Sequence, residues 1–151
     1  NVYGPRQQLF KIIMRTIIYL REGRRIYLHG GGEAIKSYIH IRDVSRGELA
    51  IIERGDVGNI YHLSPDQGIA VRDLVQLICN YMGADFDRST ETVAERPGQD
   101  AAYVIDSSLA RKTLDWAPTI TITSGIEECV EWANANWLSI VAQPHDYIHK
   151  A

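Results

Sequence analysis

The sequence predicts an α/β fold built from helices and short strands. Three segments, 9–22, 71–82 and 124–137, repeat apolar residues every three or four positions, which is typical of helices with one buried face. Between them lie short runs rich in β-branched and aromatic residues, bounded by glycine and proline, which is typical of strands. The expected order is helix, strand, strand, helix, strand, helix, strand, strand, helix, helix.

Each element follows from where its pattern starts and stops. Glycine after a helical pattern ends the helix, as at Gly23 and Gly83, and Asp43 before one is a candidate N-cap. The expected elements are the end of a strand at 1–5, a helix at 9–22, a strand at 25–29, a hairpin turn at 30–32, a strand at 35–41, a helix at 44–54 buried through Leu49, Ile51 and Ile52, a strand at 59–63, a helix at 71–82, strands at 89–93 and 103–105, a helix at 109–114 capped at Asp106, and a helix at 124–137 opened by a Ser124–Glu127 capping box. The polar tail 143–151 is expected to be mobile.

The composition is that of an ordinary globular protein, with 45% apolar and 23% charged residues. A net charge of −3 gives no general attraction for nucleic acid, so any anion site must be local. No apolar run approaches the roughly 18 residues of a transmembrane helix, so no membrane partner is expected. Cys79 and Cys129 fall in apolar helical patterns and are predicted to be buried thiols in a reducing compartment, the cytoplasm.

The turn Arg96-Pro97-Gly98 is the first candidate binding feature. Proline fixes its own φ and glycine permits a positive φ, so the arginine stands on a rigid corner. A guanidinium held in this way suits a phosphate or a carboxylate. Taken alone, the turn is more simply interpreted as a surface corner with a solvated arginine.

Several other single polar groups stand beside turns or strand ends. Each alone is more simply a surface group, but together they resemble the lining of a diphosphate site assembled from several elements. They are Asn1, Lys11, Lys36 and Arg96, with His29, His62 and Gln99 as polar neighbours. Arg15, four residues after Lys11, is predicted to be a solvated helix charge.

Catalytic and metal-binding sets are not evident in the sequence. It contains no G-x-S-x-G and no Tyr-x-x-x-Lys pair, which would let a phenol act as acid or base beside a nicotinamide. The glycines at 30–32 lack the spacing of a P-loop or a dinucleotide fingerprint. His145 and His149 have ligand-like spacing without a third ligand, so no metal is expected.

Taken in order, the motifs resemble the C-terminal half of the extended short-chain dehydrogenase/reductase family. The nucleotide-sugar 4,6-dehydratase branch, typified by dTDP-glucose 4,6-dehydratase, is the most similar, and the UDP-sugar 4-epimerases share its layout. No single motif is specific, but the ordered set is. The matching segments are Asn1–Pro5 (Asn-x-Tyr-Gly-Pro), the strand and glycine turn within Gly23–Gly32, Ile35–Val44, Gly58–His62, Glu95–Asp100 (Arg-Pro-Gly-x-Asp) and Asp106–Pro118 (ending Leu-Asp-Trp-x-Pro).

The resemblance implies a fold and a set of ligand contacts. The fold would be the C-terminal part of a Rossmann-type α/β structure, with residues 1–142 as the substrate-binding half. Lys36 takes the place of a family arginine on the phosphates, which keeps the charge and loses the bidentate geometry. His62 takes the place of a common asparagine. The implied contacts are Asn1, Lys11 and Arg96 with the diphosphate of a nucleoside-diphosphate sugar, and Tyr27 and His29 with its base.

The resemblance also implies an enzyme longer than this chain. In the family, the glycine-rich NAD loop and the Tyr-x-x-x-Lys pair precede the motif at which this chain begins. We therefore expect a parent that oxidises the sugar at C4 with bound NAD and then eliminates water or returns the hydride, as a 4,6-dehydratase or a 4-epimerase does. The 151 residues alone are expected to lack cofactor-binding and catalytic residues and to be inactive.

Partners and alternatives follow from the same expectation. The chain is expected to form a homo-oligomer or to pack on a missing N-terminal Rossmann half. A non-catalytic binding module, such as a natural truncation, remains open. An RNA-binding relative is disfavoured by the acidic charge balance and by the lack of a basic stripe with interleaved aromatics.

Overall fold

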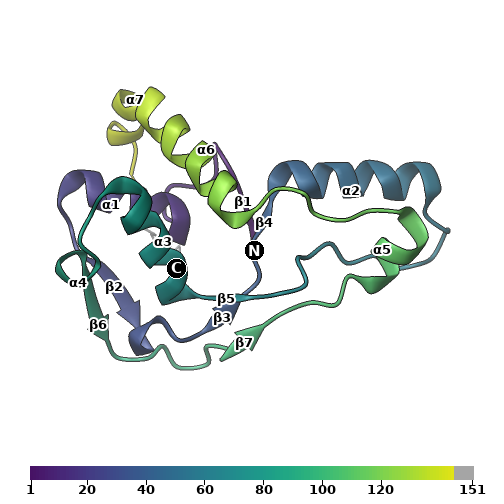
Figure 1. Cartoon of the computed structure of the whole chain (residues 1–151), viewed down its shortest axis with the longest axis horizontal. Helices are drawn as coiled ribbons and strands as arrows, with labels where there is room; N and C mark the ends of the chain where they lie inside the picture. Colours follow the sequence, from purple (N-terminus) through teal and green to yellow (C-terminus); the bar gives the residue numbers. More distant parts are fainter. Residues whose placement is uncertain (145–151) are drawn as a thin grey trace.

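The computed structural model describes residues 1–144 and confirms the mixed α/β class (Figure 1). Residues 145–151, which include His145, His149 and most of the predicted tail, lie outside the described part. The helices are α1 (Ile12–Glu22), α2 (Ile41–Arg54), α3 (Val71–Met82), α4 (Phe86–Ser89), α5 (Ser108–Leu114), α6 (Ile122–Ala135) and α7 (Trp137–Val141), with a 3₁₀ turn η1 (Gly30–Gly32). The strands are β1 (Val2–Tyr3), β2 (Ile26–His29), β3 (Ile35–Lys36), β4 (Ile39–His40), β5 (Ile69–Ala70), β6 (Thr90–Val93) and β7 (Ala102–Tyr103).

The strands form three small sheets. β1 pairs with β4 and β2 with β6, both in parallel. The third sheet has the order β5-β3-β7, with β3 antiparallel to β5 and parallel to β7. Every parallel pair joins segments far apart in sequence, so the sheets draw distant parts of the chain together.

Two hydrophobic cores stabilise this arrangement. The larger core lies where α1, α3 and α6 pack on one another and on β2, at one end of the molecule in Figure 1. Its largest side chains are fully buried: Ile13, Met14, Ile17, Ile18, Ile26, Leu74, Ile78 and Ile126. A smaller core joins α2 to α5 at the other end through Ile39, Ala50, Ala110, Leu114 and Trp116.

The helices predicted from apolar periodicity are confirmed. α3 has the predicted bounds, and Gly83 follows it with φ 69°. α1 ends at the predicted glycine, Gly23, with φ 66°, although it begins at Ile12 and not at Leu9. In both places a left-handed residue lets a backbone N–H bond to the last helical carbonyls, which a glycine does without strain.

The predicted hairpin at the three glycines is wrong. β2 pairs with β6, more than 60 residues away, and Gly30–Gly32 form a 3₁₀ turn. The single strand predicted at 35–41 is two strands, β3 and β4, which belong to different sheets. Strand partners are chosen by tertiary packing, so local sequence could not identify them.

The predicted helix at 44–54 begins earlier, at Ile41, and His40 is its N-cap, accepting the N–H of Arg42. Asp43 is therefore not the cap. It lies fully buried in the first turn. The predicted buried face is wrong for Leu49 and Ile52, which are 55% and 81% exposed, whereas Ile51 packs against the smaller core.

Two further local predictions fail. Residues 59–63 form no strand, because no described segment pairs with them. The predicted Ser124–Glu127 capping box is replaced by a cap three residues earlier, where Thr121 Oγ1 accepts the N–H of Ser124 at 3.1 Å. For residues 1–144, local sequence signals therefore predicted which segments form helices better than they predicted the residues at which the helices begin.

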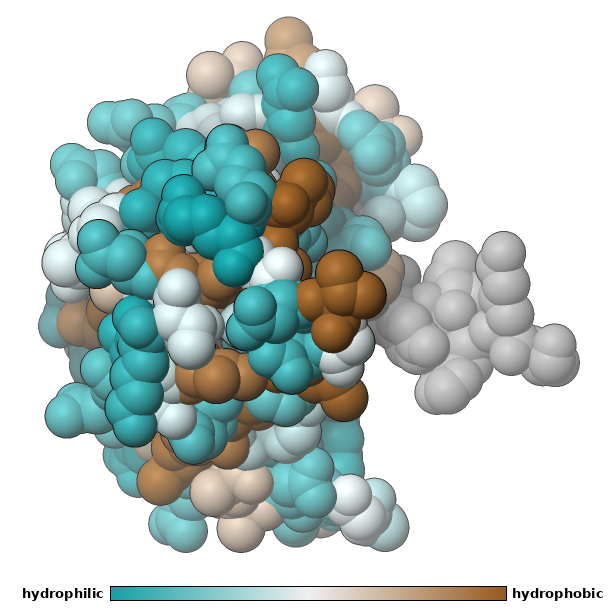
Figure 2. Space-filling model, turned by 90° about the vertical axis from the view of Figure 1, so that its right-hand side faces the viewer, coloured by the Kyte–Doolittle hydropathy of each residue, from teal (hydrophilic) through white to brown (hydrophobic). Residues whose placement is uncertain are grey.

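The surface and the buried thiols complete the description. Cys79 and Cys129 are both buried and unpaired, as predicted. No helix among residues 1–144 is long and apolar enough to cross a membrane. Figure 2 looks at the end formed by α2 and α5 and shows hydrophobic side chains exposed among hydrophilic ones. The exposed apolar residues of α2 and the segment after it are Leu49, Ile52, Val57 and Ile60.

Candidate functional site

A cavity of about 260 Å³ lies where α1 faces β2, β3 and the segment around Arg96. It collects six of the eight residues predicted to bind substrate: Asn1, Tyr27, His29, Lys36, Arg96 and Gln99. Ile12, Arg15, Gly32, Tyr38 and Val71 complete the lining. We call it the cationic cavity, because Arg15, Lys36 and Arg96 line it and no carboxylate is among its described lining residues.

The turn that carries Arg96 has the predicted geometry. Gln99 N–H donates to the carbonyl of Arg96 at 3.2 Å, which closes a four-residue turn. Gly98, the third residue, has φ 76°, a value that a glycine adopts without strain at this position. The N–H of Arg96 donates to its neighbour Glu95 at 3.0 Å. Hydrogen bonds therefore hold both the N–H and the carbonyl of Arg96, the residue that carries the guanidinium.

Lys36 ties this segment to the sheet. Its Nζ donates to the carbonyl of Asp100 at 2.8 Å, one residue beyond the turn. Lys36 lies on β3, which pairs with β7 after the turn, so the chain on both sides of Asp100 is anchored. The lysine thus contributes a charge to the cavity and a tether to the Arg96 segment.

β2 supplies the aromatic and imidazole groups. Ile26 and Leu28 are buried, so the alternate residues Tyr27 and His29 point to the opposite face. Tyr27 is 53% exposed and lines the cavity. His29 Nδ1 donates to the carbonyl of Ala94 at 3.0 Å, which leaves Nε2 as an acceptor in the neutral ring.

An adjoining cavity of about 280 Å³ contains Lys11 and shares Asn1, Ile12 and Tyr38 with the cationic cavity. Asn1 is held there by its side-chain amide, which donates to the carbonyl of Ser37 at 3.1 Å. Lys11 precedes α1 and makes no capping bond with its side chain. Burial raises the pKa of Tyr38 to about 12, so its phenol stays protonated at neutral pH.

His62 and Arg15 fall where the sequence did not predict them. His62 is exposed and lies near the carboxylate of Asp106, outside the residues that line the cationic cavity. Arg15, predicted to be a solvated helix charge, is half-buried and lines that cavity. The spacing of Arg15 from Lys11 could have indicated this position, because residues four apart lie on the same face of a helix.

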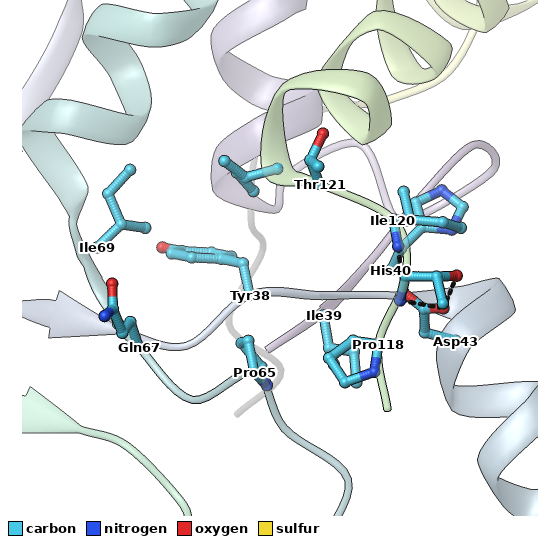
Figure 3. Close-up of a pocket in the computed structure, with 13 residues that line it drawn as sticks. Tyr38, Ile39, His40, Asp43, Pro65, Gln67, Ile69, Pro118, Ile120 and Thr121 are labelled. Carbon is cyan, nitrogen blue, oxygen red and sulfur yellow. Dashed lines mark hydrogen bonds between the residues drawn. The ribbon is translucent and has the colours of Figure 1, made fainter. Parts of the chain in front are cut away.

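A third cavity, of about 450 Å³, has a different character (Figure 3). Tyr38 extends into it toward Gln67 and Ile69, while Pro118 and Ile120 lie on the other side. Its described lining contains no lysine or arginine. This lining therefore offers no cationic counter-charge to an anion, whereas the lining of the cationic cavity does.

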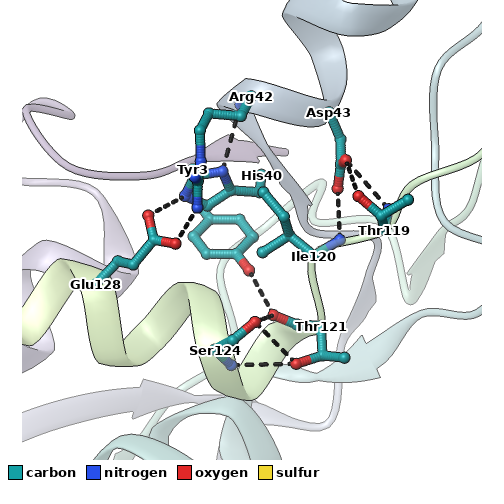
Figure 4. Close-up of polar contacts among 9 residues, drawn as sticks. All are labelled: Tyr3, His40, Arg42, Asp43, Thr119, Ile120, Thr121, Ser124 and Glu128. Atoms are coloured by element: carbon teal, nitrogen blue, oxygen red, sulfur yellow. Dashed lines mark hydrogen bonds and ion pairs between the residues drawn. The ribbon is translucent and has the colours of Figure 1, made fainter.

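Beside this third cavity, Asp43 is bound by several donors (Figure 4). Its carboxylate accepts the N–H groups of Thr119 and Ile120 at 3.1 and 3.0 Å, and it also pairs with Arg46. Burial alone would raise the pKa of this carboxyl, but the hydrogen bonds from Arg46, Ile120 and Thr119 lower it below its usual value. Asp43 therefore acts as a structural anion that joins α2 to the segment before α6.

A second cluster joins α6 to the N-terminal loop. Glu128 pairs with Arg42 and faces His40 Nε2 at 3.5 Å, while the Tyr3 ring meets the His40 ring edge-on (Figure 4). His40 is only 1% exposed, and burial lowers its pKa although Glu128 opposes this. The neutral ring accepts from Arg42 N–H at Nδ1 and presents Nε2–H to Glu128.

Comparisons with known proteins show the family to which the chain is similar. The model of the GDP-mannose 4,6 dehydratase family matches residues 1–129. A dTDP-glucose 4,6-dehydratase of Streptomyces griseus is 35% identical over 132 residues, which is 87% of this chain and 40% of that protein. The dTDP-glucose 4,6-dehydratase of Escherichia coli is 30% identical over 149 residues, covering 41% of its length. The chain thus spans about two fifths of these relatives.

Solved structures give the same picture. The dTDP-glucose 4,6-dehydratase of Streptomyces venezuelae, solved with NAD bound, has a TM-score of 0.85 at 29% identity, over 90% of this chain and 42% of that one. The UDP-glucose 4-epimerase of Thermotoga maritima, solved with UDP-glucose, has a TM-score of 0.84 at 25% identity, over 91% and 44%. These likenesses confirm the predicted Rossmann-type fold class.

Proposed function

This chain belongs to the GDP-mannose 4,6-dehydratase family, and we propose that it is the nucleotide-sugar-binding part of an NAD-dependent sugar 4,6-dehydratase. One observation carries the proposal. Residues from β2, β3 and the Arg96 turn, predicted separately to bind substrate, meet α1 in one cavity with three cations and no carboxylate among its described lining residues. Like charges repel at short range, so a bound dianion stabilises this arrangement.

We assign the groups by their chemistry. The Arg96 fork and the Lys36 ammonium bind the diphosphate, since both are charged donors at the cavity wall. Tyr27 stacks on the base, and His29 Nε2 accepts a hydrogen bond from it. Asn1 and Lys11, from the adjoining cavity, contact the diphosphate or the sugar beyond it. His62 is left out of this assignment because it lies elsewhere.

The described residues do not fit NAD. The glycines at 30–32 form a 3₁₀ turn, and Gly30 packs against the carboxylate of Glu95, which would repel a pyrophosphate. The 151 residues also contain no Tyr-x-x-x-Lys pair. We therefore propose that other residues of a longer enzyme hold NAD and the acid–base groups, and that residues 1–151 bind nucleotide sugar without turning it over.

A 4-epimerase is the second candidate, since an epimerase structure is as similar in fold as the dehydratase structures. The higher sequence identity of the dehydratases favours dehydration. A non-catalytic binding module is the third candidate. Incubating the protein with dTDP-glucose and UDP-glucose and analysing the products by NMR separates the three: a 4-keto-6-deoxy sugar marks a dehydratase, a C4 epimer marks an epimerase, and a longer parent that gives neither is a binding module.

We also propose that the exposed apolar end of α2 is covered by another part of the enzyme or by a second subunit. Leu49, Ile52, Val57 and Ile60 are exposed there, and apolar side chains that gather on a surface are typical of contact faces. Light scattering of the purified chain tests the contact face, and a stable monomer at high concentration would contradict it.

We further propose a cytoplasmic location, because both cysteines are unpaired and thiols stay unpaired in a reducing compartment.

The binding proposal is tested by thermal unfolding of the chain with dTDP, UDP, GDP and CDP. A ligand that binds only the folded state raises the melting temperature by mass action. We expect one diphosphate to raise it more than the other three, and Arg96→Ala to reduce the rise. If none of the four changes the melting temperature of the wild-type chain, the binding function is wrong.

A further inference from the structure

We propose that the third cavity, which shares Tyr38 with the cationic cavity, binds the neutral sugar of the nucleotide sugar, and that the Tyr38 hydroxyl and the Gln67 amide hydrogen-bond to that sugar. The inference rests on the proposed function and names two residues outside the predicted substrate-binding set. It also leaves Lys11, in the adjoining cavity, to the diphosphate.

Tyr38 connects the cavities of the molecule. Among their described lining residues, it is the one that the cationic cavity, the adjoining cavity of Lys11 and the third cavity have in common. It follows Lys36 of β3, which lines the cationic cavity, and precedes Ile39 of β4, which lines the third cavity. A ligand whose diphosphate lies beside Lys36 can therefore extend past Tyr38 into the third cavity.

The charges of the cavities separate the parts of the ligand. The cationic cavity and the adjoining cavity of Lys11 both contain cationic side chains, whereas the described lining of the third cavity contains no lysine or arginine. The carboxylate in that lining belongs to Asp43, which is already paired with Arg46. A phosphoryl group there would meet an anion with no lining cation to bind it, so the third cavity suits a neutral group.

The lining of the third cavity combines apolar walls with hydrogen-bonding groups. Ile69, Pro118 and Ile120 supply apolar surface, and the Tyr38 hydroxyl points toward the side of the cavity where Gln67 lies (Figure 3). None of the hydrogen bonds drawn in Figure 3 ends on this hydroxyl, and its pKa of about 12 keeps it protonated and able to donate. A hexose offers C–H faces to apolar walls and hydroxyl groups to a phenol and an amide. The volume of about 450 Å³ is that of an ordinary small-ligand site.

The test is calorimetric titration of the chain with dTDP, dTDP-glucose, UDP and UDP-glucose, because each pair differs by the glucose. For the pair that binds, we expect Tyr38→Phe to weaken binding of the glucose compound about three- to tenfold and to change diphosphate binding less than about twofold, as loss of one neutral hydrogen bond predicts. Gln67→Leu should show the same pattern. Tyr103→Phe is the matched control and should change neither affinity, because Tyr103 is 48% exposed on β7 and lies outside the described linings of the three cavities.

The outcomes separate this inference from the proposed function. Equal weakening of the diphosphate and the glucose compound by Tyr38→Phe would place the hydroxyl on the diphosphate and overturn the inference. Unchanged affinity for the glucose compound would overturn it too, while leaving the proposed function intact. If Tyr38→Phe lowers the melting temperature without ligand, Gln67→Leu decides in its place, because Gln67 is exposed and its loss should not affect folding. A wild-type chain that binds none of the four compounds would overturn both.

Discussion

The Asp43 cluster and the cationic cavity are both groups of charged side chains, but they differ in where their counter-charges lie. Asp43 is fully buried, and its oxygens accept from Arg46, Thr119 and Ile120. The cationic cavity is lined by three cations from separate elements, and no carboxylate is among its described lining residues. A charge satisfied inside the protein holds elements together, whereas a group of like charges around a cavity indicates a ligand.

The comparison extends to how each region is fixed. Trp116 Nε1 donates to the backbone carbonyl of Asp43 at 3.0 Å, so side chain and backbone of this one residue both join α2 to the segment before α6. In the cationic cavity, the Gly98 turn and the bond from Lys36 to the Asp100 carbonyl fix the backbone around Arg96. The Arg96 side chain itself is exposed. Substitution should therefore affect stability in the first region and binding in the second.

The largest expected effect is on stability. Asp43→Asn removes a buried anion and turns an amide N–H toward donors, so we expect it to lower the free energy of unfolding by about 3 kcal/mol. Urea denaturation measures this. Asp66→Asn is the matched control: its carboxylate is 74% exposed and pairs with Arg111, so its loss should cost less than about 1 kcal/mol. If the two variants lost the same free energy of unfolding, the buried carboxylate of Asp43 would be no more important for stability than an exposed one.

Next in size is a binding effect without a stability effect. Arg96→Ala should weaken nucleoside-diphosphate binding about tenfold or more, since the guanidinium is a charged donor on an exposed turn. Its melting temperature without ligand should match that of the wild type. Unchanged affinity would mean that Arg96 is only a solvated corner residue, and a large drop in melting temperature would give it a structural role.

A smaller effect is expected from acid. His40 is held neutral, with its pKa lowered by burial from 6.5, so the unfolded chain takes up a proton that the folded chain does not. Stability should therefore fall as the pH drops below 6.5 toward the folded pKa. Asp43 adds a second loss below about 3.8, because its folded pKa is depressed and its contribution disappears as the pH falls through that value.

The acid effect can be assigned with one variant. Urea denaturation at pH 7 and pH 5.5 should show a smaller difference in His40→Gln than in the wild type, because glutamine does not titrate. The other histidines are the same in both proteins and cancel. An equal difference in the two proteins would show that His40 is not the group responsible.

The smallest expected effect is at His62. The sequence placed this residue in the substrate site, whereas the structure places it near Asp106 and outside the lining of the cationic cavity. We expect His62→Ala to change diphosphate affinity less than twofold in the titration used for Arg96→Ala. A tenfold loss would extend the site to this side of the molecule.

Among the elements, the sequence alone determined those whose hydrogen bonds are local. The bounds of α3 and the glycine ends of α1 and α3 were predicted because a helix bonds to itself and its stripe of apolar residues repeats with its own period. The positive φ of Gly98 and the turn at Arg96 were predictable for the same reason. The ordered motifs and the polar groups beside turns also predicted Asn1, Tyr27, His29, Lys36, Arg96 and Gln99 as site residues, and the fold brings these six to one cavity.

Tertiary structure decided the rest. β2 pairs with β6 and not with its neighbour in sequence, and 59–63 forms no strand, because a strand exists only where a distant partner completes its hydrogen bonds. Asp43 looked like a cap because its local sequence is that of one, but its backbone donors, Thr119 and Ile120, are more than 70 residues away. Arg15 was predicted to be solvated because it lies off the apolar stripe of its helix, and only the approach of β3 and the Arg96 turn makes that helix face the wall of a cavity.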